Sequence, residues 1–247
     1  MEPEKREGER APEVNETTSR GPLDGLKVLD LSRILAGPWA SQILGDLGAE
    51  VWKIERPSGG DDTRTWGPPF LQGPGGQSDA AYFLCANRNK RSVAVDSGRP
   101  EGAEIVQRMA AAADIVVENF KKGALARYGL DYPSLSAINP GLIYCSITGF
   151  GQTGPYATRG GYDFLIQGMS GLMSVTGRPN GEPGAGPIKV GLPVSDLFTG
   201  FYAATSILAA LHHRNATGEA VATEPGPMAA LFDRGHVVPA HPGTLLM

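Results

Sequence analysis

An alternation of buried-strand and helix patterns constrains the fold of this chain more than any other feature. Residues 26–31 are predicted as a buried strand, residues 39–47 as a helix that ends at Gly48, and residues 51–54 as the next strand. Together they form a βαβ unit of about thirty residues, the length that a right-handed crossover requires. Such a unit predicts two parallel strands joined by a helix that packs on the sheet.

The alternation continues along the chain, so we predict an α/β fold with a doubly wound, mostly parallel, Rossmann-like sheet. Residues 57–80 are rich in Gly, Pro and Asp and are predicted as a long loop, which in such folds often carries function. The further predicted strands are residues 91–95, 114–118 and 142–147, and the further predicted helices are residues 102–112, 125–128, 134–138, 165–175 and 197–213.

Charge and composition argue against several classes of function. The formal net charge is −4, so no basic field indicates nucleic acid or an anionic membrane as a partner. No apolar run is expected to reach the length of a membrane span, and the N-terminus lacks the apolar core of a signal peptide. Cys85 and Cys145 are predicted to be buried thiols in a reducing compartment. We therefore expect a cytoplasmic protein.

The standard motifs for phosphate, metal and hydrolase sites do not occur in the sequence. There is no GxGxxG, no Walker A motif, no set of Cys or His residues at metal-binding spacing, and no Ser within GxSxG. We expect no metal site.

Asp163 stands where a Gly-rich loop, residues 149–161, meets the apolar start of a predicted helix. An Asp in that place is typical of an N-cap, which satisfies the open N–H groups of the helix. A partly desolvated carboxylate at the same place is also a better nucleophile than one in bulk water. The residue type alone favours the cap, and the rest of the chain reverses that order.

Basic and amide side chains gather near the predicted strand ends, where open α/β sheets bind their ligands. Lys53 and Arg56 flank the end of one strand, residues 87–91 precede another, and residues 118–120 end a third, with Arg127 further on. A polyphosphate would need such cations, with Phe120 and residues 34–36 as an apolar wall. Ordinary solvated surface charge explains the spacing equally well.

Taken together, these segments resemble family III CoA-transferases, the group that includes formyl-CoA transferase and the carnitine and bile-acid CoA-transferases. The resemblance covers about residues 22–218, which it implies to be the N-terminal part of the large domain of a two-domain fold. The matching segments are residues 23–31, 35–38, 44–51, 53–57, 60–64, 87–92, 117–120, 149–155, 161–163 and 196–200.

The resemblance implies that Asp163 is the nucleophile. It would attack an acyl-CoA thioester and pass through a mixed anhydride to an aspartyl-CoA thioester, which a carboxylic acid acceptor then converts to the new acyl-CoA. Coenzyme A would be a substrate, with no permanently bound cofactor. The residues implied to bind it are Ile34, Leu35, Ala36, Arg56, Asn119, Phe120, Ala124 and Arg127.

Two comparisons within the resemblance narrow the reaction. The related α-methylacyl-CoA racemases carry a His before the aligned Asp, whereas this chain has Tyr162, whose ordinary pKa near 10 makes it a poor base at neutral pH. Formyl-CoA transferases have Gln where this chain has Leu35. Residues 61–70 and 144–149 are similar to those of succinyl-CoA-dependent dicarboxylate transferases, which indicates a succinyl donor and a dicarboxylate acceptor.

The two ends of the chain depart from this pattern. Residues 1–21 are charged and nearly devoid of apolar side chains, so we expect a disordered tail. Residues 219–247 are expected to be an irregular tail unrelated to the family. Family members are longer, and their later segments close the active site and interlock two subunits as a homodimer. We therefore expect weak or absent turnover from the 247-residue chain, and an inactive CoA-binding fragment is the alternative.

Overall fold

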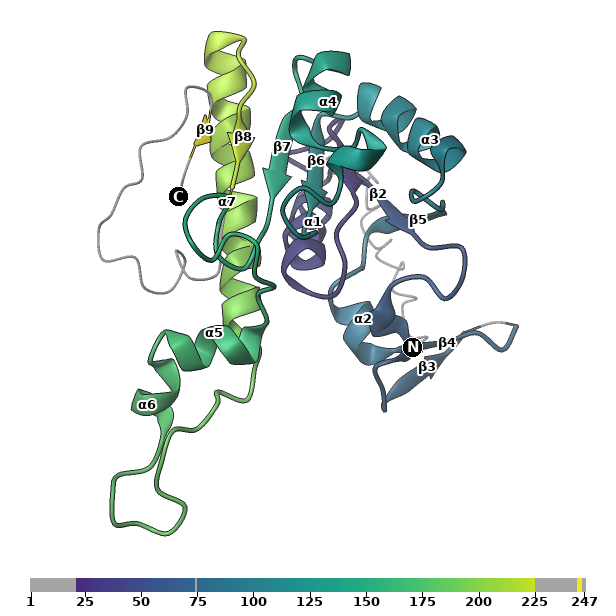
Figure 1. Ribbon diagram of the computed structural model, residues 1–247. Coiled ribbons are helices and arrows are strands. Elements are labelled where there is room, and N and C mark those ends of the chain that lie inside the picture. Colours follow the sequence, from purple (N-terminus) through teal and green to yellow (C-terminus); the bar gives the residue numbers. More distant parts are fainter. Residues whose placement is uncertain (1–20, 74, 225–243, 246–247) are drawn as a thin grey trace, which may run out of the picture.

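The computed structural model describes residues 21–73, 75–224 and 244–245, and its centre is a seven-stranded sheet in the order β5-β2-β1-β6-β7-β8-β9 (Figure 1). Every neighbouring pair in this sheet is parallel, which confirms the predicted fold class. The strands are β1 (Lys27–Asp30), β2 (Glu50–Glu55), β5 (Lys90–Ala94), β6 (Ile115–Glu118), β7 (Ile143–Ser146), β8 (Ala222–Thr223) and β9 (Thr244–Leu245).

Helices cover both faces of the sheet. On one face α1 (Ala36–Asp46) and α7 (Val194–Thr217) pack together, and on the other lie α3 (Pro100–Ala111) and α4 (Tyr132–Ile138) (Figure 1). Successive strand residues point to opposite faces, so Val28 of β1 joins the first cluster and Leu29 joins the second. Both residues are fully buried, as expected for a parallel sheet that is covered on both sides.

The strand order reverses between β1 and β6. From β1 the chain runs outward through β2 to β5, and it then returns to β6 on the opposite side of β1. The loops that leave these two strands meet across this switch point. Asn119 Oδ1 accepts the backbone N–H of Arg33 at 2.8 Å, and Asn119 Nδ2 donates to the Arg33 carbonyl at 2.7 Å. Ligands of open α/β sheets bind in the crevice that forms at such a point.

The segment between β2 and β5 is more ordered than the predicted loop. It holds a 3₁₀ turn η1 (Asp62–Thr65), an antiparallel hairpin of β3 (Phe70–Gln72) and β4 (Ser78–Ala80), and the short helix α2 (Ala81–Cys85). The elements are too short to show a hydrophobic period. Cys85 is exposed at the end of α2, so its predicted burial is wrong, whereas Cys145 is buried in β7.

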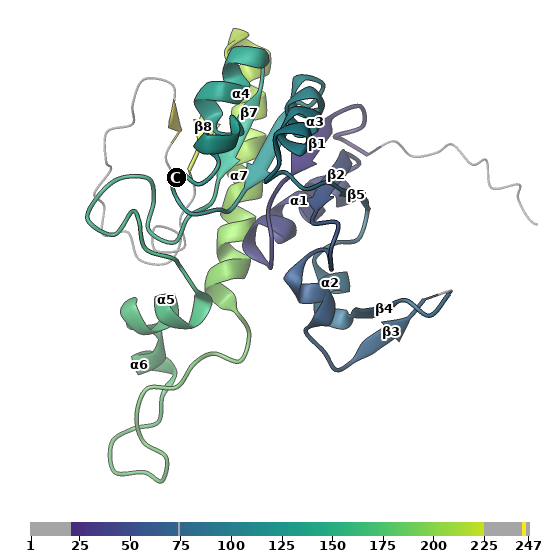
Figure 2. The same ribbon diagram turned by 45° about the vertical axis from the view of Figure 1, so that its right-hand side comes forward.

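The predicted helix over residues 165–175 is two helices. α5 (Asp163–Met169) ends at Ser170, and α6 (Leu172–Thr176) begins after Gly171, whose φ of 81° breaks the helical path. A further 3₁₀ turn, η2 (Ala126–Tyr128), follows β6. Figures 1 and 2 show α5, α6 and the segment after them projecting beyond the end of the sheet.

Helix α7 corrects the expectation of no membrane-length apolar run, since it is long and apolar enough to pass that test by length and composition. It nevertheless packs against α1 and β7, and its residues Ala203, Ile207 and Ala210 belong to a buried core cluster. Core helices of globular proteins pass the same test. The half of α7 that extends past the sheet carries exposed Phe198, Phe201 and Tyr202.

The two ends of the chain fall largely outside the described residues. The predicted disordered tail, residues 1–21, lies there except for Gly21. Within the predicted irregular tail, the structure forms β8, which pairs with β7 through Tyr144 and Ala222. Residues 221–223 are Val, Ala and Thr, short and partly β-branched side chains that suit a strand.

Candidate functional site

A cavity of about 400 Å³ lies at the switch point of the sheet. Its walls come from the loops after β1, β6 and β7 and from the first turns of α5 and α7. Nine residues were implied by the resemblance as nucleophile or CoA ligands. Seven of them line this cavity together, namely Ile34, Leu35, Ala36, Asn119, Phe120, Ala124 and Asp163. Its volume is that of a small-molecule site.

The other two nominated residues lie elsewhere. Arg56 lines a neighbouring cavity of about 50 Å³ that shares Arg33 and Phe120 with the larger one. Its guanidinium is half exposed and pairs with Asp62 at 2.5 Å. Arg127 stacks its guanidinium 4.6 Å from the centre of the Tyr128 ring and lines neither of these two cavities.

Asp163 is the first residue of α5, and its carboxylate does not cap that helix. Tyr162 occupies the N-cap position, so the N-cap interpretation of Asp163 is wrong for its own helix. Instead, Asp163 Oδ1 accepts the backbone N–H of Ser195 in the first turn of α7 at 2.9 Å, and Oδ2 accepts Gln167 Nε2 at 2.7 Å. The two hydrogen bonds orient the carboxylate at the cavity wall.

Two glycines allow the loop before Asp163 to reach this place. The Cα of Gly161 lies so near the Cα of Gly149 that a Cβ added to either residue would be 2.3 Å from the other backbone. No side chain fits between two loops at that distance. The Gly-rich sequence on both sides of the cavity is therefore a packing requirement of the site.

A second carboxyl group, that of Asp196, lines the same cavity. It lies in the first turn of α7, one residue after Ser195. Burial, together with the nearby charge of Asp163, raises the pKa of Asp196 to about 7. The Tyr82 hydroxyl of α2 is close enough for both carboxylates to contribute, after burial, to a pKa raised to about 12.

Cations balance these carboxylates around the cavity. Arg33, Lys121, Lys122 and Arg159 all line it. The guanidinium of Arg33 lies 5.4 Å from the centre of the Phe120 ring, and that of Arg159 lies 4.2 Å from the Tyr156 ring. Such stacked guanidinium groups can bind phosphate or carboxylate oxygens through their free edges.

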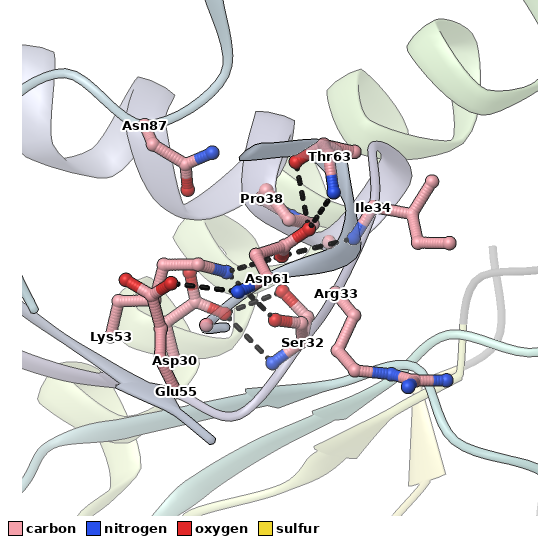
Figure 3. Close-up of polar contacts among 12 residues, drawn as sticks. Asp30, Ser32, Arg33, Ile34, Pro38, Lys53, Glu55, Asp61, Thr63 and Asn87 are labelled. Carbon is pink, nitrogen blue, oxygen red and sulfur yellow. Dashed lines mark hydrogen bonds and ion pairs between the residues drawn. The ribbon is translucent and has the colours of Figure 1, made fainter. Parts of the chain in front are cut away.

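A buried charge cluster, which we define as Asp30, Lys53, Glu55, Asp61 and Lys90, reaches the wall of the smaller cavity through Glu55 and Asp61. Figure 3 shows Asp30, Lys53, Glu55 and Asp61. Lys53 Nζ pairs with Asp61 at 3.0 Å, and Lys90 Nζ pairs with Asp30 at 3.1 Å. The sequence nominated both lysines as candidate anion ligands. The structure corrects this, because their side chains are almost fully buried and already paired.

Neighbouring cations and hydrogen bonds keep the buried carboxylates ionised. Burial by itself would raise the pKa of Asp30, but the charges of Lys90 and Lys53 and the hydroxyls of Ser32 and Ser41 together lower it to about 2. The pKa of Glu55 is lowered to about 2 in the same way, against the effect of burial, chiefly by hydrogen bonds from Arg64 and Ser92.

The cluster is connected to the cavity through Ile34. Asp61 Oδ2 accepts the Ile34 backbone N–H at 3.2 Å, while Asp61 Oδ1 accepts the Thr63 N–H and hydroxyl (Figure 3). Ile34 has a φ of 70°, a conformation that costs energy for a β-branched residue. The buried Asp61 thus holds a strained residue of the cavity wall in place.

Glu118, at the end of β6, is a further buried carboxyl group near this edge. It accepts a short hydrogen bond from the Ser146 hydroxyl and another from the Phe120 N–H at 2.8 Å. Burial outweighs these bonds and raises the pKa of Glu118 to about 7.

No role was predicted from the sequence for Asp196, Gln167, Arg33 or Arg159. Asp196 stood within a segment noted only for its similarity. Its position three residues after Pro193 is a signal that could have been used, because an acidic side chain there belongs to the first turn of a helix. Gln167 is one turn after Asp163, a spacing that brings the two side chains together.

Comparison with known proteins identifies relatives of this chain. The family model for CoA-transferase family III matches residues 23–232, whereas the sequence predicted residues 22–218 for this unit. The chain is 56% identical over 199 residues to succinate–glutarate CoA-transferase of Agrobacterium fabrum, covering 80% of this chain and 49% of that protein. It is 50% identical over 198 residues to human succinyl-CoA:glutarate CoA-transferase, covering 80% of this chain and 43% of that protein.

A solved structure is similar as well. The crystal structure of a CaiB/BaiF family protein from Brucella suis superposes with a TM-score of 0.80 at 55% identity, covering 86% of this chain and 55% of that one. The chain thus spans about half the length of the relatives it matches.

Proposed function

Because this chain belongs to CoA-transferase family III, we propose that it contributes the nucleophile and much of the CoA site for CoA transfer between an acyl-CoA and a carboxylic acid. One observation carries the proposal. Asp163 lines the same cavity as six residues nominated for CoA binding, and that cavity lies at the switch point of the sheet.

In the proposed reaction, a carboxylate oxygen of Asp163 attacks the thioester carbonyl and expels the CoA thiolate, which leaves a mixed anhydride. The thiolate then attacks the Asp163 carbonyl, releases the donor acid as a carboxylate and forms the aspartyl-CoA thioester. An acceptor carboxylate attacks this thioester and expels the CoA thiolate, which leaves a second mixed anhydride. The thiolate then attacks the acceptor carbonyl, which forms the new acyl-CoA and releases the Asp163 carboxylate. Each step forms one acyl bond and breaks another, and the complete cycle regenerates the Asp163 carboxylate.

The geometry of Asp163 suits a nucleophile. Its two hydrogen bonds, from Ser195 and Gln167, fix the direction of the carboxylate without occupying all its lone pairs. Orientation of this kind supplies a large part of the rate of an intramolecular step.

For CoA, we propose that Ile34, Leu35 and Ala36 contact the thioester end of the molecule, with Asn119 and Phe120 across the crevice. The half-exposed Arg56 and the neighbouring Arg33 are placed to bind phosphate oxygens, since both lie beside the smaller cavity next to Phe120. Arg127 is the weakest of the nominated CoA ligands, because it stacks on Tyr128 outside both cavities.

We propose succinyl-CoA as the donor and a dicarboxylate as the acceptor. The Agrobacterium and human relatives carry these substrates in their names, and the four cations that line the cavity would hold the second carboxylate. A racemase-like reaction is the alternative. The residue before Asp163 is the exposed Tyr162, which is unsuited to remove an α-proton at neutral pH.

We further propose that the protein acts in the cytoplasm and assembles as a homodimer. The projecting part of the molecule supports assembly, because Phe164, Val175, Leu192 and Phe198 are largely exposed on α5, α6, α7 and the segment between them. Sedimentation of the purified protein at several concentrations tests the dimer.

Incubation with succinyl-CoA followed by acid quench and peptide mass spectrometry tests the nucleophile. We expect a CoA adduct on the peptide that contains Asp163, and no adduct in Asp163→Asn, which keeps the size and one acceptor of the side chain. Glu104→Gln, an exposed change on the opposite face of the sheet, is the control and should retain the adduct. Binding of CoA without an adduct in the wild-type protein would instead support a non-catalytic CoA-binding protein. Exchange of the α-proton of a 2-methylacyl-CoA in deuterated water would support the racemase.

A further inference from the structure

The carboxyl group of Asp196 has no hydrogen-bond partner within the part of the chain that the structure describes, yet it lines the cavity beside Asp163. A partly buried carboxyl group normally finds a donor, because leaving it without one is unfavourable. The carboxyl oxygens of Asp196 are therefore available for hydrogen bonding to a molecule in the cavity where we propose that the reaction occurs.

The local sequence explains why Asp196 has no partner. A carboxylate at the third position of a helix ordinarily accepts the backbone N–H of the N-cap residue. The N-cap residue of α7 is Pro193, which has no N–H. The next two donors in this turn are also occupied, because the Val194 N–H bonds to the Leu192 carbonyl and the Ser195 N–H bonds to Asp163.

Asp196 also lies close to the reacting atoms. It follows Ser195, whose nitrogen is 2.9 Å from Asp163 Oδ1, and its side chain lines the same cavity as Asp163. A thioester bound at Asp163 would therefore share this cavity with Asp196.

We propose that Asp196 is a second catalytic residue, a carboxylic acid that exchanges a proton with the sulfur of CoA. This inference rests on the proposed function of Asp163. When Asp163 expels the thiolate, the Asp196 acid gives its proton to sulfur, leaving the Asp196 carboxylate and the CoA thiol. When sulfur attacks the anhydride, Asp196 takes the proton back as the carbon–sulfur bond forms. The proton is conserved over the two steps, and no other reactant is needed.

The charges around Asp196 suit this role. Asp163 of α5 and Tyr82 of α2 are titratable groups that interact electrostatically with Asp196. The cations Arg33, Lys121, Lys122 and Arg159 line the same cavity. While Asp163 is ionised, its charge favours the protonated form of Asp196. Acylation removes that charge, so Asp196 becomes a stronger acid when the thiolate is released.

The test measures the rate of adduct formation on Asp163 with succinyl-CoA between pH 5.5 and 9. In the wild-type protein we expect the rate to depend on a group that titrates near neutral pH. Asp196→Asn should lower the rate roughly 100-fold or more and remove this dependence, because Asn cannot carry the proton. Asp196→Glu should restore part of the rate, and CoA binding by calorimetry should change less than about twofold in both variants.

Three results would overturn the inference. One is an Asp196→Asn protein that forms the adduct at the wild-type rate. Another is a pH profile that is unchanged in this variant, since that would indicate a merely structural role. The third is a carbon-13 NMR titration in which Asp196 has an ordinary Asp pKa, whether or not an adduct forms. Failure of the wild-type protein to form any adduct would contradict the proposed function itself, and the proton exchange with it.

Discussion

The buried charge cluster and the two cavity carboxylates use the same chemical group in opposite ways. Asp61 accepts four donors, from Lys53, Ile34 and, twice, Thr63. Asp163 accepts two, and Asp196 accepts none from the described residues. A carboxylate offers about four lone-pair sites, so the first group is saturated and the others are not.

This difference separates structural carboxylates from reactive ones. A saturated carboxylate is fixed in position and charge, and it cannot attack a carbonyl without breaking its hydrogen bonds. Asp163 keeps free lone pairs and an enforced direction, and Asp196 keeps a choice of protonation state. The pKa values follow the same division, because that of Asp30 is lowered to about 2 and that of Asp196 is raised to about 7.

Removal of Asp61 should have the largest effect on stability. Asp61→Ala leaves the Lys53 ammonium buried without its partner and frees the strained Ile34, so we expect a loss of about 3–5 kcal/mol in the free energy of unfolding. Urea denaturation measures this. Asp62→Ala, the neighbouring carboxylate on the surface, should cost no more than about 1 kcal/mol. Equal losses in the two variants would contradict a structural role for the cluster.

Carboxyl groups with lowered pKa values and those with raised pKa values should respond to pH in opposite directions. The folded pKa values of Asp30 and Glu55 lie below their unfolded values, so their contribution to stability is present above about pH 4 and is lost as the pH falls towards 2. Glu118 and Asp196 have raised pKa values near 7, so their contribution to stability is present below about pH 4 and is lost as the pH rises through 7.

Urea midpoints measured from pH 2.5 to 8 should therefore decline at both ends. Glu118→Gln should flatten the limb between pH 5 and 7 and leave the acidic limb unchanged. A wild-type midpoint that keeps rising from pH 5 to 8 would rule out the raised pKa values.

Gln167 should couple stability to reactivity. Gln167→Met removes one of the two bonds to Asp163 and leaves the Val190 N–H, which Gln167 Oε1 accepts at 2.9 Å, without a partner. We expect a loss of about 1–3 kcal/mol in the free energy of unfolding and roughly tenfold slower adduct formation. The control is Gln107→Met on α3, which loses hydrogen bonds to the backbone carbonyls of Tyr128 and Gly129. This variant should be less stable than the wild-type protein but should form the adduct at the wild-type rate.

The smallest effect should come from Ile34. Ile34→Gly relieves the left-handed strain while losing a partly buried side chain, so we expect a net change below about 1 kcal/mol in the free energy of unfolding. Leu35→Gly removes a buried side chain without that compensation, and a loss of about 2–5 kcal/mol is expected. Calorimetric unfolding of the two variants compares them, and a larger loss at Ile34 would show that its conformation is not strained.

Most of the fold could be predicted from the sequence, because buried strands and helix ends leave local patterns. The strands β1, β2, β5, β6 and β7 were predicted within one residue of their bounds, whereas the helix α1 begins three residues before its predicted start. The hairpin of β3 and β4 was missed because its three-residue strands show no period. The break between α5 and α6 was missed because a single Gly171 decides it.

The candidate site divides in the same way. Segments that follow strand ends, such as residues 34–36 and 119–120, were nominated from their similarity and do meet at one cavity. In the sequence, Lys53 and Lys90 cannot be told from lysines that bind phosphate. Only their burial against Asp61 and Asp30 shows that they are structural. No pattern in the sequence marked Arg127 as lying outside the cavity.

The sequence by itself determined the parallel α/β fold and the set of loops that lie at one edge of the sheet, since both depend on patterns within a few residues along the chain. Only the tertiary structure decided which charged side chains are buried and saturated and which are open to the cavity. That distinction depends on contacts between residues such as Asp163 and Ser195, which are 32 positions apart. Hydrogen-bond saturation and desolvation arise only when such distant segments are packed together.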